Sequence, residues 1–114
     1  MEETPLVKGD IISGQTCISN KNMIHELEQK GYGEIEKEKL FLKQFETLYL
    51  LYAKRLILKN GNKQFDFNSF MSLSQKTNPE ILTKFLIYRD LRNRGYVVKD
   101  GFGFGSDFRV YERG

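Results

Sequence analysis

The chain has 114 residues and a mass of 13.4 kDa, the size of one ordinary domain or two very small ones, which excludes a large multidomain enzyme. Hydrophobic residues make up 39% and charged residues 29%, so the chain can build a core and differs from a disordered sequence. A formal charge of +3 permits an anionic partner without identifying one.

Cysteine content and hydropathy indicate where such a chain can act. The one cysteine, Cys17, cannot form an internal disulfide, so the sequence fits a reducing compartment and predicts a cytoplasmic protein. No apolar stretch approaches the roughly 18 residues that a membrane-spanning helix requires. Residues 1–5 lack the basic and apolar regions of a signal peptide. We therefore expect neither a membrane span nor secretion.

The type of basic residue changes along the chain. Residues 1–77 contain ten lysines and one arginine, whereas residues 78–114 contain two lysines and five arginines. The planar guanidinium of arginine suits bidentate contact with phosphate, whereas lysine more often only solvates a surface. We predict an α+β fold with a boundary near residue 77: a small amino-terminal α+β domain over 1–77, then the first helix and strands of a second domain over 78–114.

The first segment begins with short strands and a helix. Strands are expected around residues 10–12 and 16–18, because apolar residues flank the turn at Gly14. A helix over residues 22–29 follows, capped by Ser19 or Asn20 and ended by the glycines at 31 and 33. Residues 40–42 fit either a strand or the entry to a helix.

Helical spacing returns in the second half of this segment. Apolar residues from Phe45 to Ala53 predict a helix, and residues 56–58 predict a strand that runs into the hairpin-type turn Asn60-Gly61. Residues 65–73 favour a further short helix beginning after Asp66 or Asn68, although Phe65 and Phe67 alone would fit a strand equally well.

The second segment opens with a helix predicted over residues 79–94. Its start is either a capping box from Thr77 to Glu80 or an Asn78 cap with Pro79 in the first helical position. Gly95 is suited to end it. A broad apolar stripe runs along the helix and consists of Ile81, Leu82, Phe85, Leu86, Tyr88 and Leu91.

Two strands follow this helix, over residues 96–98 and 107–111, joined by a glycine-rich turn over 100–105. One helix and two strands cannot bury both faces of a sheet. We therefore expect another chain, or further residues of a longer polypeptide, to complete this half.

Two features of the sequence carry no chemistry by themselves. The run Gly101-Phe102-Gly103-Phe104-Gly105 lacks the spacing of a dinucleotide fingerprint and the Gly-Lys-Ser/Thr of a P-loop, so a tight turn between strands is expected. His25 is the only histidine, which disfavours a multi-histidine metal site and a Ser-His-Asp triad. We expect His25 to be a surface residue.

Two sets of residues could carry chemistry. Four cations on the predicted helix, Lys84, Arg89, Arg92 and Arg94, could line a phosphate backbone or could form a solvated face paired with Asp90. On the last strand, Arg109, Tyr111 and Arg113 alternate and would point the same way. Two nearby cations would favour the phenolate form that a phenolic general base requires, although a tyrosine on a strand is more often a packing residue.

The second segment resembles the start of the catalytic domain of the archaeal tRNA-intron endonucleases, the tRNA-splicing enzymes. The resemblance lies in the run Tyr88-Arg89-Asp90-Leu91-Arg92-Asn93-Arg94-Gly95-Tyr96-Val97-Val98-Lys99, then Gly101, Gly105 and Asp107-Phe108-Arg109-Val110-Tyr111. The first segment is similar to the amino-terminal domain of that family more loosely, through Gly31-Tyr32-Gly33, the run from Phe45 to Leu50, and Phe67-Asn68-Ser69-Phe70.

The resemblance implies RNA cleavage without a metal or other cofactor, at the bulge-helix-bulge junctions of precursor tRNA. The products would carry 2′,3′-cyclic phosphate and 5′-hydroxyl ends. The family uses a Tyr, His and Lys triad, and Tyr111 matches the tyrosine that acts as general base on the ribose 2′-hydroxyl. The general-acid His and the Lys are expected beyond Gly114, and His25 matches neither, so the 114 residues alone are expected to be inactive.

The sequence thus predicts a subunit or part of a tRNA-splicing endonuclease, with precursor tRNA and further endonuclease chains as partners in a homo- or hetero-oligomer. Tyr111 is the expected catalytic residue, and Arg92, Arg109 and Arg113 are the expected RNA contacts. Two alternatives stay open: a noncatalytic structural subunit of a hetero-oligomeric endonuclease, in which Tyr111 only packs, and an RNA-binding module.

Overall fold

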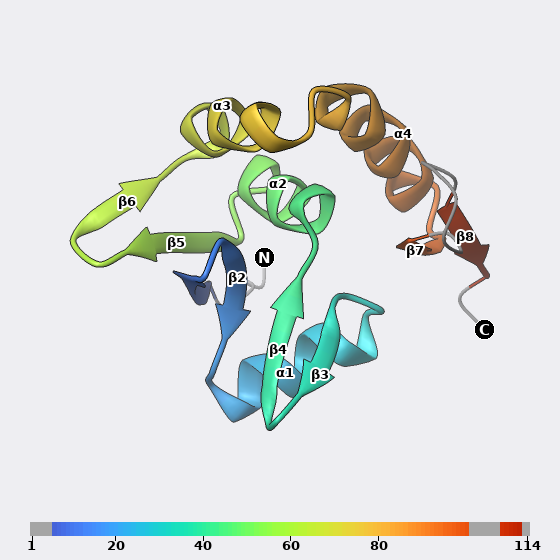
Figure 1. The fold of residues 1–114 in the computed structure, drawn as a ribbon. Helices are drawn as coiled ribbons and strands as arrows, with labels where there is room; N and C mark the ends of the chain where they lie inside the picture. Colours follow the sequence, from blue (N-terminus) through green and yellow to red (C-terminus); the bar gives the residue numbers. More distant parts are fainter. Residues whose placement is uncertain (1–5, 101–107, 113–114) are drawn as a thin grey trace.

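A computed structural model describes residues 6–100 and 108–112, which form the predicted α+β fold (Figure 1). The strands are β1 (Val7–Ile12), β2 (Gln15–Ile18), β3 (Glu34–Glu36), β4 (Lys39–Leu42), β5 (Leu56–Asn60), β6 (Lys63–Phe65), β7 (Val97–Asp100) and β8 (Phe108–Tyr111). The helices are α1 (Lys21–Gln29), α2 (Gln44–Tyr52), α3 (Phe67–Thr77) and α4 (Ile81–Asn93). Six strands form one mixed sheet in the order β3-β4-β2-β1-β5-β6, and β7 and β8 form a separate antiparallel pair.

Strand β1 lies inside the larger sheet and is paired on both sides. It pairs antiparallel with β2, through a turn in which Ser13 and Gly14 have φ of 51° and 79°. Two consecutive positive φ values are typical of the tight turns that match the twist of a hairpin. On its other side β1 runs parallel to β5, with Val7 opposite Leu56. The strands predicted around residues 10–12, 16–18 and 56–58 are confirmed.

The hairpin of β3 and β4 was only half predicted from sequence. Residues 39–42 form a strand, which settles the alternative left open there, but the partner strand Glu34–Glu36 was not foreseen. All three residues of β3 are exposed, and the turn places Lys37 and Glu38 at φ of 50° and 67° without a glycine. Strand β3 therefore has no alternation of buried and exposed residues, and its turn lacks the glycine that usually predicts a hairpin.

Helix α2 lies at the centre of the fold, between the larger sheet and the pair α3 and α4 (Figure 1). Leu48 and Leu50 on this helix have no exposed surface, and Phe45 is 2% exposed. A helix covered on several sides is apolar around most of its circumference. The core therefore forms around α2 and joins both segments of the chain.

Side-chain caps fix the starts of two helices as the sequence predicts. Asn20, rather than Ser19, caps α1, because its side-chain oxygen accepts a hydrogen bond from Met23 N at 3.1 Å. Asp66 caps α3 by accepting from Ser69 N at 2.8 Å. Phe65 ends β6 and Phe67 begins α3, so this stretch holds both a strand end and a helix start.

The predicted start of the next helix is wrong by two residues. Helix α4 begins at Ile81, after an N-cap at Glu80 that makes no side-chain cap bond. Thr77 cannot form the expected capping box, because α3 continues through it and its hydroxyl donates to Ser74 O. The Asn78 side chain does accept from Glu80 N at 3.3 Å, but it does so within the link between the two helices.

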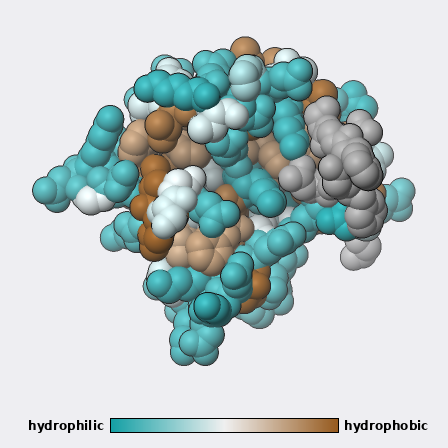
Figure 2. All heavy atoms as spheres, viewed as in Figure 1, coloured by the Kyte–Doolittle hydropathy of each residue, from teal (hydrophilic) through white to brown (hydrophobic). Residues whose placement is uncertain are grey.

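The apolar stripe of α4 is divided between two environments. Phe85 and Tyr88 are buried in the core, whereas Leu82 and Leu86 are 44% and 40% exposed. Ile87, which the predicted stripe does not include, is 48% exposed. Figure 2 shows a mostly hydrophilic face with small hydrophobic areas, some of them along the edge formed by α3 and α4. Part of α4 is thus an apolar surface that none of the described residues covers.

The first segment covers part of the β7–β8 pair. The ring of Phe108 packs edge-on against Phe45, with centroids 5.1 Å apart, and lies 5.9 Å from the ring of Tyr88. Sequence reasoning assigned the cover of this pair to polypeptide outside the 114 residues. The structure corrects this in part, because α2 supplies one of the contacts.

Candidate functional site

Tyr111, the expected catalytic residue, ends β8 with a side chain that is 47% exposed. It lies directly opposite Val97 in the antiparallel register of β7 and β8, and Arg109 lies opposite Lys99. Side chains of directly opposed residues share a face, and alternate residues of a strand do as well. Val97, Lys99, Arg109 and Tyr111 therefore project from one face of the pair.

Of the other expected RNA contacts on this strand, Arg109 is half-buried. Arg113 lies outside the described residues, as does the turn predicted over residues 100–105 except for Asp100, which ends β7. The part of the strand that can be described thus brings one arginine and Tyr111 to the same face of β8.

Arg92 is placed inside the protein instead of on a surface that RNA could reach. Its side chain is buried, with the residue 9% exposed. Its Nε donates to the Tyr88 hydroxyl at 3.0 Å and its Nη1 donates to Lys30 O at 2.8 Å. The guanidinium carbon lies 3.9 Å from the centroid of the Tyr32 ring, within the range of a cation–π contact. Arg92 therefore links α4 to the residues that follow α1.

Lys99 and Glu46 converge on the same stretch of backbone. Lys99 Nζ donates to Gly33 O at 2.8 Å, and Gly33 N donates to Glu46 Oε2 at 2.8 Å. The other oxygen of the Glu46 carboxyl accepts from Lys43 N, also at 2.8 Å, at the start of α2. Glu46 is 2% exposed. The buried Glu46 carboxyl thus connects the start of α2 to Gly33. Lys99 of β7 contacts the carbonyl of the same Gly33.

Burial changes the acid–base properties of this region. It raises the pKa of the Glu46 carboxyl, although the N–H groups of Gly33 and Lys43 and the charges of Lys99 and Arg92 act in the opposite direction. Burial also raises the pKa of the Tyr32 and Tyr88 phenols, with Arg92 opposing the shift. Both phenols are therefore neutral at physiological pH, and the Tyr88 hydroxyl can accept from Arg92.

The other helical cations also contact protein groups. Lys84 Nζ lies 5.1 Å from the ring centroid of Phe45 and 5.5 Å from that of Phe108. Arg89 lies over the Tyr52 ring at 5.4 Å. Arg94 forms an exposed ion pair with Asp90 at 3.3 Å, as the predicted pairing on a solvated face requires. The four cations do not form one uniform charged stripe.

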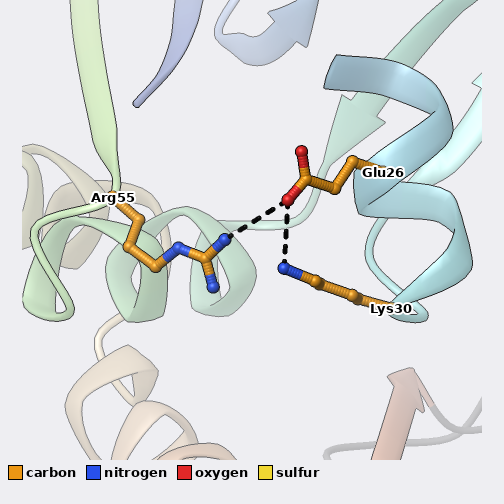
Figure 3. A network of polar contacts seen from close by, with 3 residues as sticks. All are labelled: Glu26, Lys30 and Arg55. Atoms are coloured by element: carbon orange, nitrogen blue, oxygen red, sulfur yellow. Dashed lines mark hydrogen bonds and ion pairs between the residues drawn. The ribbon is translucent and has the colours of Figure 1, made fainter. Parts of the chain in front are cut away.

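A polar network holds the end of α1 against the start of β5 (Figure 3). Glu26 Oε1 is the shared acceptor: Lys30 Nζ lies 3.2 Å and Arg55 Nη2 lies 3.9 Å from it. All three side chains are partly exposed, so the energy of these pairs is modest. Their effect is to place the residues after α1 relative to the sheet.

Other sequence predictions concern absences and single residues. His25 is exposed on α1, as expected. Among residues 6–100 and 108–112, no group of three or more His, Cys, Asp or Glu side chains is arranged to hold a metal ion. No helix in the same residues is long and apolar enough to cross a membrane.

Comparison with known sequences places both segments in one family. Residues 7–71 match the model of the tRNA intron endonuclease N-terminal domain, and residues 81–114 match the model of the tRNA intron endonuclease catalytic C-terminal domain. The chain therefore belongs to the tRNA intron endonuclease family, and the resemblance seen in its sequence is confirmed.

Several relatives are named tRNA-splicing endonuclease. Identity is 38% over 105 residues with that of Thermococcus onnurineus, covering 90% of this chain and 61% of the relative. It is 40% over 85 residues with that of Pyrococcus furiosus, covering 75% and 50%. For Methanococcus maripaludis it is 39% over 97 residues, covering 84% and 55%. The chain thus spans about half to three-fifths of the length of these relatives.

Sequence reasoning did not find Glu46 or Lys99. Glu46 stands three residues after the N-cap Lys43, which is the spacing of a capping box. Because lysine is not a typical N-cap residue, the sequence pattern does not predict this box. No sequence pattern predicts the contact of Lys99, because its partner is the backbone carbonyl of Gly33, 66 positions earlier in the chain.

Proposed function

We propose that this chain is part of a tRNA-splicing endonuclease that cleaves precursor tRNA at bulge-helix-bulge exon–intron junctions and leaves 2′,3′-cyclic phosphate and 5′-hydroxyl ends. The observation that carries the proposal is the place of Tyr111: its exposed phenol ends β8, within the residues that match the catalytic domain. The relatives are named tRNA-splicing endonuclease, which supports tRNA as the class of substrate.

In this proposal Tyr111 acts as general base. In its phenolate form Tyr111 takes the proton of a ribose 2′-hydroxyl and becomes the neutral phenol, the 2′-oxygen attacks the adjacent phosphorus, and the bond to the 5′-oxygen breaks. The leaving oxygen needs a proton, and the developing negative charge needs a cation. We infer that a His and a Lys supply these from polypeptide beyond residue 114 or from another chain. The lyase-type cleavage then needs no metal or cofactor.

RNA contacts are proposed for the arginines beside Tyr111. Arg109 lies two residues before it on the same face of β8, and Arg113 follows it in sequence. Arginine suits phosphate because its planar guanidinium donates two parallel hydrogen bonds. Arg92 faces the protein interior, so the RNA-contact proposal rests on the other two arginines.

Two features of organisation belong to the same proposal. We divide the chain into an amino-terminal domain, residues 1–77, and the start of a catalytic nuclease domain, residues 78–114; the family matches leave residues 72–80 between them, which supports this division. We further propose a homo- or hetero-oligomer acting in the cytoplasm. The exposed apolar residues of α4 support association with further polypeptide.

The test is single-turnover cleavage of a bulge-helix-bulge substrate by a full-length enzyme. Tyr111→Phe keeps the ring and removes the phenolic oxygen, so we expect cleavage to slow by about a hundredfold or more, with tRNA affinity nearly unchanged. Tyr52→Phe is the matched control, because Tyr52 is also 47% exposed but lies on α2. Equal rates for Tyr111→Phe and wild type would reject Tyr111 as base and favour a noncatalytic structural subunit.

A further inference from the structure

Four contacts from distant parts of the chain meet on the short loop after α1. We define the docking loop as residues Lys30–Gly33. Arg92 donates to the first carbonyl of this loop and Lys99 donates to the last one, each at 2.8 Å. Glu46 accepts from the N–H of Gly33, also at 2.8 Å. Elements α4, β7 and α2 are thus all attached to the same four residues.

The fourth contact is the close approach of Val97 to the loop. A Cβ added at Gly31 would lie 2.5 Å from Val97 Cγ1, a distance that real Cβ atoms essentially never show. Gly31 also has φ of 83°, which a side chain rarely adopts. A glycine at this position allows β7 to lie directly on the loop.

The first segment shapes the docking loop by its own contacts. Gly31 N donates to Glu28 O at 3.0 Å and Tyr32 N donates to Leu27 O at 2.9 Å, so the loop closes the end of α1. The side chain of Tyr32 is 6% exposed and packs in the core. The ion pairs of Glu26 with Lys30 and Arg55 hold the same end of α1 (Figure 3). The loop is therefore a fixed base on which a second element can be placed.

The residues of β7 that contact the loop are the cross-strand partners of the proposed RNA-facing residues. Val97 contacts Gly31 and lies opposite Tyr111, while Lys99 contacts Gly33 and lies opposite Arg109. Directly opposed residues have Cβ atoms roughly 5 Å apart and share a face. A shift of β7 on the loop would therefore move Tyr111 as well.

We propose that Arg92 and Lys99 are positioning residues, which hold the β7–β8 pair on the docking loop and so fix the location of Tyr111. Arg92 is suited to this role because one rigid guanidinium contacts the Lys30 carbonyl, the Tyr88 hydroxyl and the Tyr32 ring together. The docking of the β7–β8 pair on this loop is inferred from contacts within this chain. Only its consequence for cleavage rests on the function proposed for Tyr111.

Hydrogen exchange of backbone amides in the 114-residue chain tests the docking. Arg92→Lys keeps the charge but cannot contact Lys30 O and the Tyr88 hydroxyl in the same geometry. We expect it to lower the protection of β7 and β8 amides by at least about tenfold, the scale of a lost hydrogen bond from a charged group, and to leave β1, β2 and β4 unchanged. Arg94→Lys is the control, since Arg94 is the C-cap residue of the same helix and makes an exposed ion pair with Asp90.

Lys99→Met provides a second variant, because it keeps an unbranched stem and removes the ammonium that donates to Gly33 O. It should reproduce the selective loss of protection in β7 and β8. Loss of equal size in both sheets would mean that Arg92 and Lys99 only stabilise the fold, and would overturn the proposal. Unchanged exchange in both variants would overturn it as well.

Cleavage by a full-length enzyme tests the consequence for Tyr111. Arg92→Lys should slow single-turnover cleavage by about tenfold or more, while the dissociation constant for precursor tRNA changes less than about twofold. A reduced affinity at an unchanged cleavage rate would instead assign Arg92 to RNA binding and reject the positioning role. If Tyr111→Phe has no effect on cleavage but exchange in β7 and β8 still rises in Arg92→Lys, the docking holds and the proposed function of Tyr111 fails.

Discussion

Val97 of β7 lies against Gly31 of the docking loop so closely that an alanine Cβ at position 31 would be 2.5 Å from Val97 Cγ1. The contact joins the segment that matches the amino-terminal domain of the family to the segment that matches its catalytic domain. Val97 Cγ2 and Cβ would also lie within 3.3 Å of the added Cβ, so either the Val97 side chain or the backbone of one segment must shift to accept it.

Gly31→Ala should therefore destabilise the chain more than a glycine substitution that meets only backbone strain. Gly95 provides the control: its φ is 93° and a Cβ there meets nothing within 4 Å. We expect Gly31→Ala to cost roughly 1–3 kcal/mol more than Gly95→Ala, the scale of overpacking in a close contact. Urea unfolding measures both, and equal losses would show that Val97 moves aside freely.

Tyr88→Phe should cost roughly 1–3 kcal/mol of unfolding free energy, because it removes the acceptor of a buried charged donor. The Tyr88 hydroxyl accepts from Arg92 Nε, and Arg92 Nη2 already has no hydrogen-bond partner among the described residues. Tyr49→Phe is the matched control, since its hydroxyl bonds to Asn93 at an exposed position. A loss for Tyr88→Phe no greater than for Tyr49→Phe would contradict the assigned bond.

The stability of the chain should depend on pH through Glu46. Burial raises the pKa of this carboxyl above its ordinary value of 4.5, so the folded state keeps the proton to higher pH than the unfolded chain. At pH values between the pKa of Glu46 in the unfolded chain and its higher pKa in the folded state, the folded state binds more protons than the unfolded chain. The unfolding free energy therefore falls as pH rises through this range. The contribution of Glu46 is fully present below about pH 4.5 and is lost as pH rises through the raised pKa.

Urea unfolding from pH 4 to pH 8 measures this dependence, with Glu46→Gln as the non-titrating reference. The unfolding free energy of the wild type relative to the variant should decline with rising pH. A relative gain in wild-type stability over the same range would show that Gly33, Lys43, Lys99 and Arg92 outweigh the cost of burial.

The uncovered apolar face of α4 should make the 114-residue chain associate. Leu82, Leu86 and Ile87 are each at least 40% exposed, as is Val110 on β8. We expect concentration-dependent association in sedimentation velocity and binding of a hydrophobic dye, both reduced by Leu86→Lys. A monomer that unfolds cooperatively and binds no dye would contradict this expectation and the proposed oligomer.

Local chemistry allowed much of the fold to be predicted. Asn20 and Asp66 are good capping residues with donors three residues away, and the helices that they start were found at nearly the right positions. The sequence signal Asn60-Gly61 located the hairpin of β5 and β6 to within one residue: Asn60 is the last residue of β5 and pairs with Lys63, and the turn is formed by Gly61, with φ of 62°, and Asn62. The start of α4 was misplaced, because Thr77 offers a cap signal but lies inside α3.

The sequence by itself determined the α+β class, the family and the strand that carries Tyr111, because each depends on neighbouring residues or on a contiguous motif. Only the tertiary structure decided the place of Arg92, which sequence reasoning assigned to RNA and which contacts Lys30, Tyr32 and Tyr88 instead. The physical reason is that the free energy of a buried cation depends on its partners. Those partners include backbone atoms and an aromatic ring far away in the chain, and only the folded arrangement brings them to Arg92.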